Sequence, residues 1–311
     1  MTTPAGTAGV PAPSSDRERI EAVVTRDRIV ELQLDPVKGN FDAAHLREVN
    51  RRIFQDMPGK GFDDVRPGQY RQQVPSSGDW MKNRGLTTAA GNFFVAYSPM
   101  NAASQAKIDE VLKEAKPAKL AALDPEQFTK TLAKVYAELD YIHPFADGNS
   151  RTLRTFTKQL ANEAGYDLDW ERFNRSVGTR DALYVARDKA VNAIALPRMQ
   201  NERSMARIVG SMDRLKANKN LEQILEGAAR PLRAVAFERE PATDAVKKHP
   251  ELEGAYRTLT AATKFASSLE LADQVKFVEQ ARASIQTTLN AGKLVPEPPM
   301  KKKERDQGHE R

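Results

Sequence analysis

The stretch that decides the fold reads His-Pro-Phe-Ala-Asp-Gly-Asn-Ser-Arg-Thr-Leu-Arg and covers residues 143–154. Before it, Asp124-Pro125 is typical of a helix start, and the apolar residues that follow recur at helical spacing. After it, Leu153, Phe156 and Leu160 recur in the same way, and Gly165 is typical of a helix end. The pattern therefore predicts two helices, the second over Ser150–Ala164, joined by a tight loop that bends at Gly148.

The start of the second helix is suited to an anion. Its first amides have no intrahelical acceptor and the helix dipole is positive there, and Asn149 or Ser150 stands at the cap position. Arg151 and Arg154 are three residues apart, so they share one face of the first turn. Two guanidinium groups beside free amides favour a polyphosphate ligand.

Two further residues of the loop add chemistry to this anion site. Asp147 is a candidate ligand for Mg²⁺, which usually takes one or two carboxylates together with phosphate oxygens. His143 is the nearby side chain whose ordinary pKa lets it accept a proton near neutral pH. A capped helix with solvated arginines and a structural histidine explains any one of these residues, but the whole set within twelve residues favours a nucleotide site with a general base.

This stretch resembles the signature of the Fic family, His-Pro-Phe-x-[Asp/Glu]-Gly-Asn-Gly-Arg-x-x-Arg, at every defined position except Ser150. Upstream, Gly39-Asn40-Phe41-Asp42, His45-Leu46 and Ile53-Phe54-Gln55-Asp56 resemble the early helices of the family. The resemblance covers roughly residues 16–200. It implies a mostly α fold, a Fic-type helical bundle with a short β-hairpin flap, and here a C-terminal helical extension.

The flap falls on an aromatic and β-branched segment between Gly91 and Pro99, which reads as extended. By resemblance, this flap docks the target protein, and the residues that would do so are Phe93, Phe94, Val95, Ala96 and Tyr97.

The resemblance also implies a reaction, the transfer of AMP from ATP to a Ser, Thr or Tyr hydroxyl of a protein, with release of pyrophosphate. His143 would deprotonate the hydroxyl, and Asp147 would hold Mg²⁺. Gly148, Asn149 and Ser150 would cradle phosphates, Asn149 mainly the α-phosphate. Arg151 and Arg154 would hold the β- and γ-phosphates.

Ser150 replaces the second glycine of the family motif. A bulky lysine at this position accompanies phosphorylation in one family branch, whereas serine is small and caps helices well, so we expect AMP transfer. Transfer of UMP, phosphocholine or phosphate remains an alternative. So does a nucleotide-binding or interaction module with little catalysis.

Many family members are inhibited by a helix with the motif [Ser/Thr]-x-x-x-Glu-[Gly/Asn], whose Glu pairs with the second motif arginine, here Arg154. Glu precedes Gly at Glu226 and Glu253, but Glu222 and His249 stand four residues earlier, so the strict motif is absent. Either a separate small antitoxin supplies it, or the protein is an effector that acts in another cell.

Composition sets the limits of these interpretations. The chain has 311 residues, no cysteine, four histidines and a net charge of +6. The lack of cysteine excludes Cys-ligated metal sites. The net charge is too weak to indicate direct nucleic-acid binding. No apolar run is long enough to span a membrane and no signal peptide is visible. We expect a cytoplasmic protein, or one delivered into another cell.

The pattern divides the chain into four parts: a disordered tail (1–15), a Fic-like catalytic domain (16–200), a helical C-terminal domain (201–294) and a disordered basic tail (295–311). Further helices are predicted at 16–32, 43–55, 103–114, 172–195, 202–217, 220–235, 243–265 and 272–291. The segment His249–Tyr256 faintly resembles conjugative-plasmid proteins, which makes a type IV secretion connection an open alternative to a simple packing extension.

Overall fold

The computed structural model describes residues 16–73 and 79–297. The N-terminal tail predicted at 1–15, and residues 298–311 of the basic tail, lie outside the described residues. The chain forms two compact units that divide between Ala229 and Arg230. We predicted a boundary at 200/201, but the next helix belongs to the first unit because its Ile208 packs in one cluster with Ala96 and Ala195.

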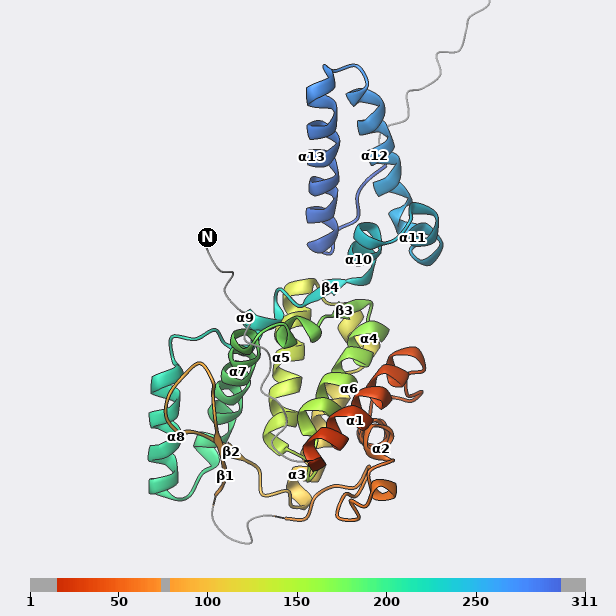
Figure 1. Ribbon diagram of the computed structural model, residues 1–311. Helices are drawn as coiled ribbons and strands as arrows, with labels where there is room; N and C mark the ends of the chain where they lie inside the picture. The colour runs from red at the N-terminus through yellow and green to blue at the C-terminus, as the bar shows by residue number, and fades with distance from the viewer. Residues whose placement is uncertain (1–15, 74–78, 298–311) are drawn as a thin grey trace, which may run out of the picture. The chain divides into compact units, whose positions relative to one another are not determined.

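The first unit is a helical bundle (Figure 1). Its helices are α1 (Asp16–Leu34), α2 (Ala43–Phe54), α3 (Ala102–Glu114), α4 (Pro117–Ala121), α5 (Pro125–Ile142), α6 (Asn149–Glu163), α7 (Val177–Ala195), α8 (Glu202–Leu215) and α9 (Leu221–Leu225). Three short 3-10 helices are η1 (Pro58–Lys60), η2 (Glu171–Asn174) and η3 (Leu196–Arg198). The strands are β1 (Trp80–Arg84), β2 (Phe93–Tyr97), β3 (Tyr166–Leu168) and, across the division, β4 (Ala229–Pro231).

Helices α5 and α6 form the centre of this bundle, as the sequence pattern predicted. Asp124 caps α5 by accepting a hydrogen bond from the Gln127 amide at 2.8 Å. The apolar faces of both helices are buried, with Phe128 and Leu132 on α5 and Phe156 on α6 at 0% exposure. Helix α7 packs on α5, while α1 and α2 pack on α6. Burial of these faces fixes the α5–α6 loop between two sets of helices.

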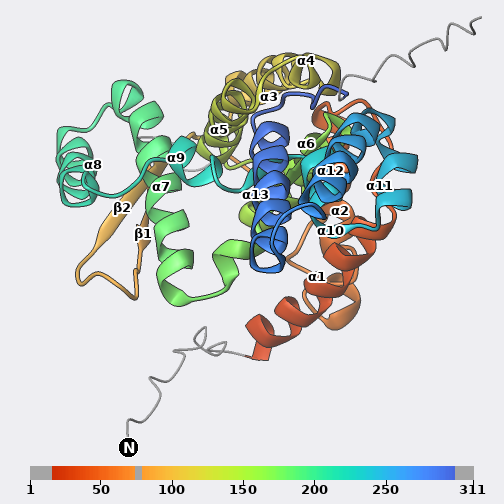
Figure 2. The same cartoon turned by 90° about the horizontal axis from the view of Figure 1, so that it is seen from above.

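The extended segment predicted before Pro99 is β2, and it pairs antiparallel with β1 in the β-hairpin that the family resemblance implied, although the position of β1 was not predicted. The register places Trp80 opposite Tyr97 and Lys82 opposite Val95. The views in Figures 1 and 2 both place the hairpin beside α7 and α8, which contact β2. Four of the five β2 residues are buried in consequence.

Two long helices predicted in the last third of the chain are each divided into two. The predicted helix over 220–235 is α9 and α10 (Leu232–Arg239), which are separated by a turn and by Pro231. The predicted helix over 243–265 is α11 (Ala242–Lys248) and α12 (Glu253–Ala266), with η4 (Pro250–Leu252) between them. Proline has no amide to donate to the preceding turn, so α11 stops before Pro250. Helix α9 already ends at Leu225 in the turn at 226–228, and Pro231 stands at the N-cap of α10.

The second unit has its own small core. Helices α10, α11, α12 and α13 (Leu271–Asn290) bury Phe237, Leu252, Ile285 and Leu289 together. Val295 packs against this cluster and Glu297 pairs with Arg257 at 2.9 Å, so the ordered chain extends past the predicted start of the basic tail. Among the described residues, no helix is both long and apolar enough to cross a membrane.

Candidate active site

The α5–α6 loop is shaped by two residues in left-handed backbone conformation. His143 ends α5 with φ of 49°, and its amide donates to the Leu139 carbonyl at 3.1 Å. Gly148 precedes α6 with φ of 70°, and a Cβ atom there would lie 1.9 Å from the Phe54 ring. Only glycine fits this bend, because both the backbone angle and the close approach exclude a side chain.

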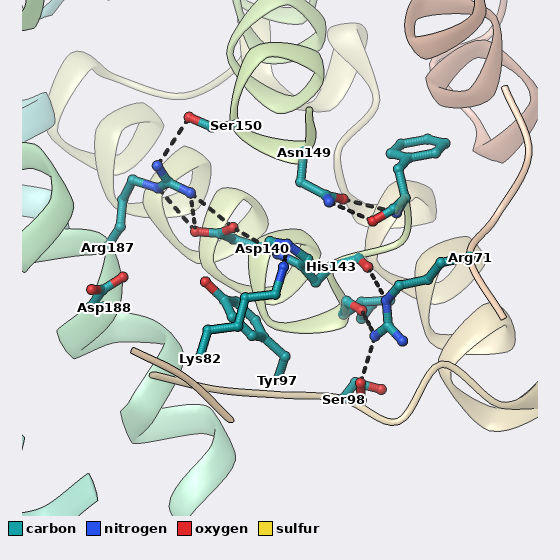
Figure 3. Close-up of polar contacts among 12 residues, drawn as sticks. Arg71, Lys82, Tyr97, Ser98, Asp140, His143, Asn149, Ser150, Arg187 and Asp188 are labelled. Carbon is teal, nitrogen blue, oxygen red and sulfur yellow. Dashed lines mark hydrogen bonds and ion pairs between the residues drawn. The ribbon is translucent and has the colours of Figure 1, made fainter. Parts of the chain in front are cut away.

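Asn149 closes the loop from within. Its Oδ1 accepts from the Phe145 amide at 2.9 Å, and its Nδ2 donates to the Phe145 carbonyl at 2.7 Å (Figure 3). Both polar ends of this buried side chain are therefore used by the loop itself. A contact of Asn149 with a phosphate would come from its backbone amide or from the second N–H of Nδ2.

The start of α6 has the free amides that the sequence predicted. The first amide of the helical ladder is that of Thr152, which donates to the Gly148 carbonyl at 2.9 Å. The amides of Asn149, Ser150 and Arg151 precede this ladder and form the positive end of the helix. Ser150 does not obstruct them, because its Oγ accepts a hydrogen bond from Arg187 Nη1 at 3.0 Å.

His143 is held through its backbone by Arg71. The Arg71 guanidinium donates to the His143 carbonyl from Nε at 2.6 Å and to the Ser98 carbonyl from Nη2 at 2.6 Å. It lies over the Trp80 ring, and burial lowers the Arg71 pKa to about 10. Arg71 thereby joins the loop to the segment that follows β2.

A buried ion pair lies behind the His143 ring. Asp140 on α5 and Arg187 on α7 make bidentate contacts at 2.9–3.0 Å, and their side chains are 1% and 3% exposed. Asp140 Oδ1 also lies 3.8 Å from His143 Nδ1. Although burial opposes ionisation, Arg187 and His143 hold the Asp140 pKa low, at about 2.

The His143 ring is neutral at physiological pH. It is buried against Tyr97, with ring centroids 4.1 Å apart, and burial lowers its pKa to about 4 against an opposing effect of Asp140. Its Nε2 lies 3.2 Å from Lys82 Nζ, which comes from β1. A neutral imidazole can accept a proton, which is the condition for a general base.

Asp147 is exposed and, among the described residues, has no hydrogen bond or ion pair. That part of the chain also holds no cluster of three or more acidic or histidine residues able to bind a metal alone. A single accessible carboxylate beside an anion site fits Mg²⁺, because this ion keeps several waters and takes phosphate oxygens as ligands.

The two motif arginines have different surroundings. Arg151 pairs with Glu21, and its Nη1 donates to Thr25 Oγ1 at 3.0 Å, so α1 holds it. Arg154 donates from Nε to the Ser150 carbonyl at 3.3 Å, and its pKa is lowered by burial. Both line a cavity of about 570 Å³ between α1 and α6, with Phe41 and Trp170 in its apolar wall.

The structure thus brings His143, Gly148, Asn149 and Ser150 together at one loop, with Asp147 beside them. Four further residues of the site were not predicted from the sequence: Arg71, Lys82, Asp140 and Arg187. Asp140 carries a detectable signal, since it stands one helical turn before His143. The other three come from distant segments, and nothing in their local sequence points to the loop.

Both edges of β2 are occupied, which bears on the predicted docking role of residues 93–97. One edge pairs with β1. At the other, the Phe94 amide donates to Ser211 Oγ and the Ala96 amide to Asn192 Oδ1, each at 3.0 Å. Asn192 Nδ2 also donates to the Phe94 carbonyl at 2.9 Å. A docking segment therefore finds no pairing edge on β2 itself.

Comparison with known proteins places this loop in a family. The model of the Fic/DOC family matches residues 40–161. Protein adenylyltransferase VbhT of Bartonella schoenbuchensis is 30% identical over 53% of this chain and 30% of its own length. The probable protein adenylyltransferase Fic of Escherichia coli is 31% identical over 48% of this chain and 62% of its own length. The chain thus spans less than two thirds of the length of each of these two relatives.

Among solved structures, the N-terminal Fic domain of a VirB-translocated Bep effector from Bartonella quintana, with bound ADP, has a TM-score of 0.43 and 19% identity. It covers 74% of this chain and 92% of that chain. The Phe41–Phe156 packing, the α5–α6 loop and the motif at 143–154 all lie within the residues matched by the family model. Residues 40–161 of the first unit therefore form a Fic domain.

Proposed function

We propose that this protein transfers AMP from ATP to a hydroxyl side chain of a target protein and releases pyrophosphate. The observation that carries the proposal is a neutral histidine one loop away from the unpaired amides of a helix start. His143 accepts the hydroxyl proton, and the amides ahead of Thr152 neutralise phosphate charge. Positioning and charge neutralisation are what such phosphoryl-type chemistry requires.

The surroundings of Ser150 favour AMP transfer over the alternatives that its replacement of glycine left open. Its side chain is small and points to Arg187 on α7, which donates to its Oγ at 3.0 Å (Figure 3). A bulky cation at this position would compete with the nucleotide. Serine, like glycine, leaves the anion site free for the nucleotide.

Magnesium is the cofactor that the site implies. Asp147 would hold it, since this carboxylate is exposed and unpaired within the described residues. The ion would supply positive charge beside the phosphates. His143 lies four residues before Asp147 in the sequence, and it accepts the hydroxyl proton independently of the ion.

The target docks as an extended segment on β1. Both edges of β2 are used, whereas β1 pairs only with β2 among the described residues. The amides of Phe94 and Ala96 point away from β1. The residues of β2 that hydrogen-bond to β1 are therefore the alternate ones, Phe93, Val95 and Tyr97. Met81 and Asn83 then present their backbone groups to the open edge, where a target strand can add.

Control of the enzyme would act on Arg154. Within the described part of the chain this guanidinium has no carboxylate partner, and it lines the cavity between α1 and α6. The cavity combines an apolar wall with Arg151, Arg154 and Lys158, which suits a small helical antitoxin that inserts a glutamate. If no such partner exists, the protein acts as an effector in another cell, where type IV secretion is one route of delivery.

The test compares two labels on ATP. The purified chain is incubated with Mg²⁺ and a cell lysate, with the label on either the α- or the γ-phosphate. AMP transfer labels protein from α-labelled ATP alone, and His143→Ala abolishes this labelling. Labelling from the γ-phosphate would indicate phosphorylation, and ATP binding without labelling would indicate a binding module.

A further inference from the structure

The hairpin places one charged side chain at the reactive nitrogen of His143. Lys82 Nζ lies 3.2 Å from His143 Nε2 (Figure 3). It also lies 4.8 Å from the centre of the Trp80 ring. Burial lowers the pKa of Lys82, while the charges of Asp147 and Asp140 raise it. The lysine is thus half-buried between the hairpin and the loop.

The tautomer of His143 follows from its two neighbours. Nδ1 has no hydrogen-bond partner within the described residues, and the Asp140 carboxylate lies 3.8 Å from it. A carboxylate only accepts, so the ring proton belongs on Nδ1 and the lone pair on Nε2. An ammonium group only donates, so Lys82 donates to that lone pair.

The hairpin register places this contact where a target residue would arrive. Trp80, Lys82 and Arg84 alternate along β1 and share the face that is directed at the site, since Arg84 pairs with the buried Asp188 at 2.9 Å. A segment added to the open edge of β1 has one residue directly opposite Lys82. Opposite residues point to the same face, with Cβ atoms about 5 Å apart.

We propose that Lys82 is a positioning residue that reserves Nε2 of His143 for the target hydroxyl. This rests on the proposed function. Without a target, the ammonium occupies the lone pair that a water molecule would need in order to attack ATP. The docked residue opposite Lys82 takes its place. The hydroxyl proton then passes to Nε2, its oxygen bonds to the α-phosphorus, and the bond to the leaving pyrophosphate breaks.

The charged groups around His143 give this proposal a second readout. Asp140 on α5 raises the pKa of His143, whereas Lys82 on β1 and Arg71 lower it. Tyr97 on β2 contacts the ring, and Arg187 on α7 acts through Asp140. Removing the positive charge of Lys82 should therefore raise the pKa of His143.

The experiment compares Lys82→Met, Lys82→Gln and Lys82→Arg with the wild-type chain, with Lys130→Met as the control at an exposed lysine of α5. Free AMP released from α-labelled ATP is measured without a target. We expect release to rise about tenfold in Lys82→Met, the scale of one lost charged hydrogen bond, and to stay near wild type in Lys82→Arg and Lys130→Met. Lys82→Gln, which keeps a donor without the charge, should fall between them.

Nitrogen-15 NMR of the histidines follows His143 directly, with His143→Ala identifying its signals. The wild type should carry its proton on Nδ1 at neutral pH, and Lys82→Met should titrate at a higher pH than wild type. Unchanged AMP release together with an unchanged titration would overturn the role of Lys82. If no variant and no wild-type sample releases or transfers AMP, the proposed function fails, and the titration still decides whether Lys82 controls His143.

Discussion

Asp140 and Arg187 form a bidentate ion pair at 2.9–3.0 Å inside the first unit, and Arg187 also donates to Ser150 Oγ at 3.0 Å. One guanidinium group thus joins three helices: α5, which ends in the general base, α6, which begins at the anion site, and α7. Arg187 on α7 therefore holds the general base at the end of α5 and the anion site at the start of α6 in place relative to each other. Substitution of this ion pair therefore tests how far the site depends on the residues that hold it in place.

Arg187→Met should destabilise the first unit strongly. It leaves the Asp140 carboxylate buried without its partner, which typically costs about 3–5 kcal/mol of the free energy of unfolding. Urea denaturation of the variant measures this loss. The matched control is Lys107→Met, which removes one partner of the exposed pair Lys107–Glu110 and should cost at most about 1 kcal/mol. Equal losses in the two variants would show that the buried pair has no special role.

The pH dependence of transfer should follow the lowered pKa of His143. Because burial lowers this pKa to about 4, the ring stays neutral from neutral pH down to about pH 5, and the rate of transfer should be nearly level there. The rate should then fall as the pH passes through about 4, where the ring gains its proton. Initial rates with α-labelled ATP give the profile, and circular dichroism at each pH separates loss of the base from unfolding. A midpoint near 6.5 would contradict the buried position of His143.

The sequence predicted the core of this site but not its support. The motif at 143–154 predicted the loop, the bend at Gly148 and the free amides, because these depend on residues adjacent in the chain. Lys82, Arg71 and Arg187 depend on how distant segments pack, and a single sequence does not reveal this. Periodicity likewise predicted single helices through Pro231 and Pro250, but the first is broken by the turn at 226–228 and the second by the missing amide of Pro250. The roles of Asn149, Arg151 and Arg154 toward phosphate remain predictions, and Asn149 and Arg151 have partners within the protein.

The open edge of β1 can be tested at one backbone amide. Asn83→Pro removes the amide that we place at this edge and leaves the ladder to β2 in place, since proline is tolerated where the amide faces outward. Labelling of lysate proteins should fall several-fold, while ATP binding stays close to wild type. Asn83→Ala is the control, because it removes the side-chain bond to Asn92 and keeps the amide. If alanine reduces labelling as much as proline does, the side chain matters and the edge does not.

The unpaired charge of Arg154 leads to the last prediction. Arg154→Ala should weaken ATP binding, whereas His143→Ala should abolish transfer and leave Mg·ATP binding close to intact, and calorimetry with a non-hydrolysable ATP analogue separates the two.

Since no carboxylate of the described residues pairs with Arg154, the purified chain should be active without an activating mutation. Where its target lies in the producing cell, expression should arrest growth and His143→Ala should relieve the arrest. A co-expressed small helical protein with a glutamate that enters the cavity between α1 and α6 should also restore growth. A charge pair closed off from water there can be worth several kcal/mol, enough to exclude a phosphate. A wild-type chain that stays inert until one of its own helices is deleted, for instance around Glu226 or Glu253, would show that control is built into the chain instead.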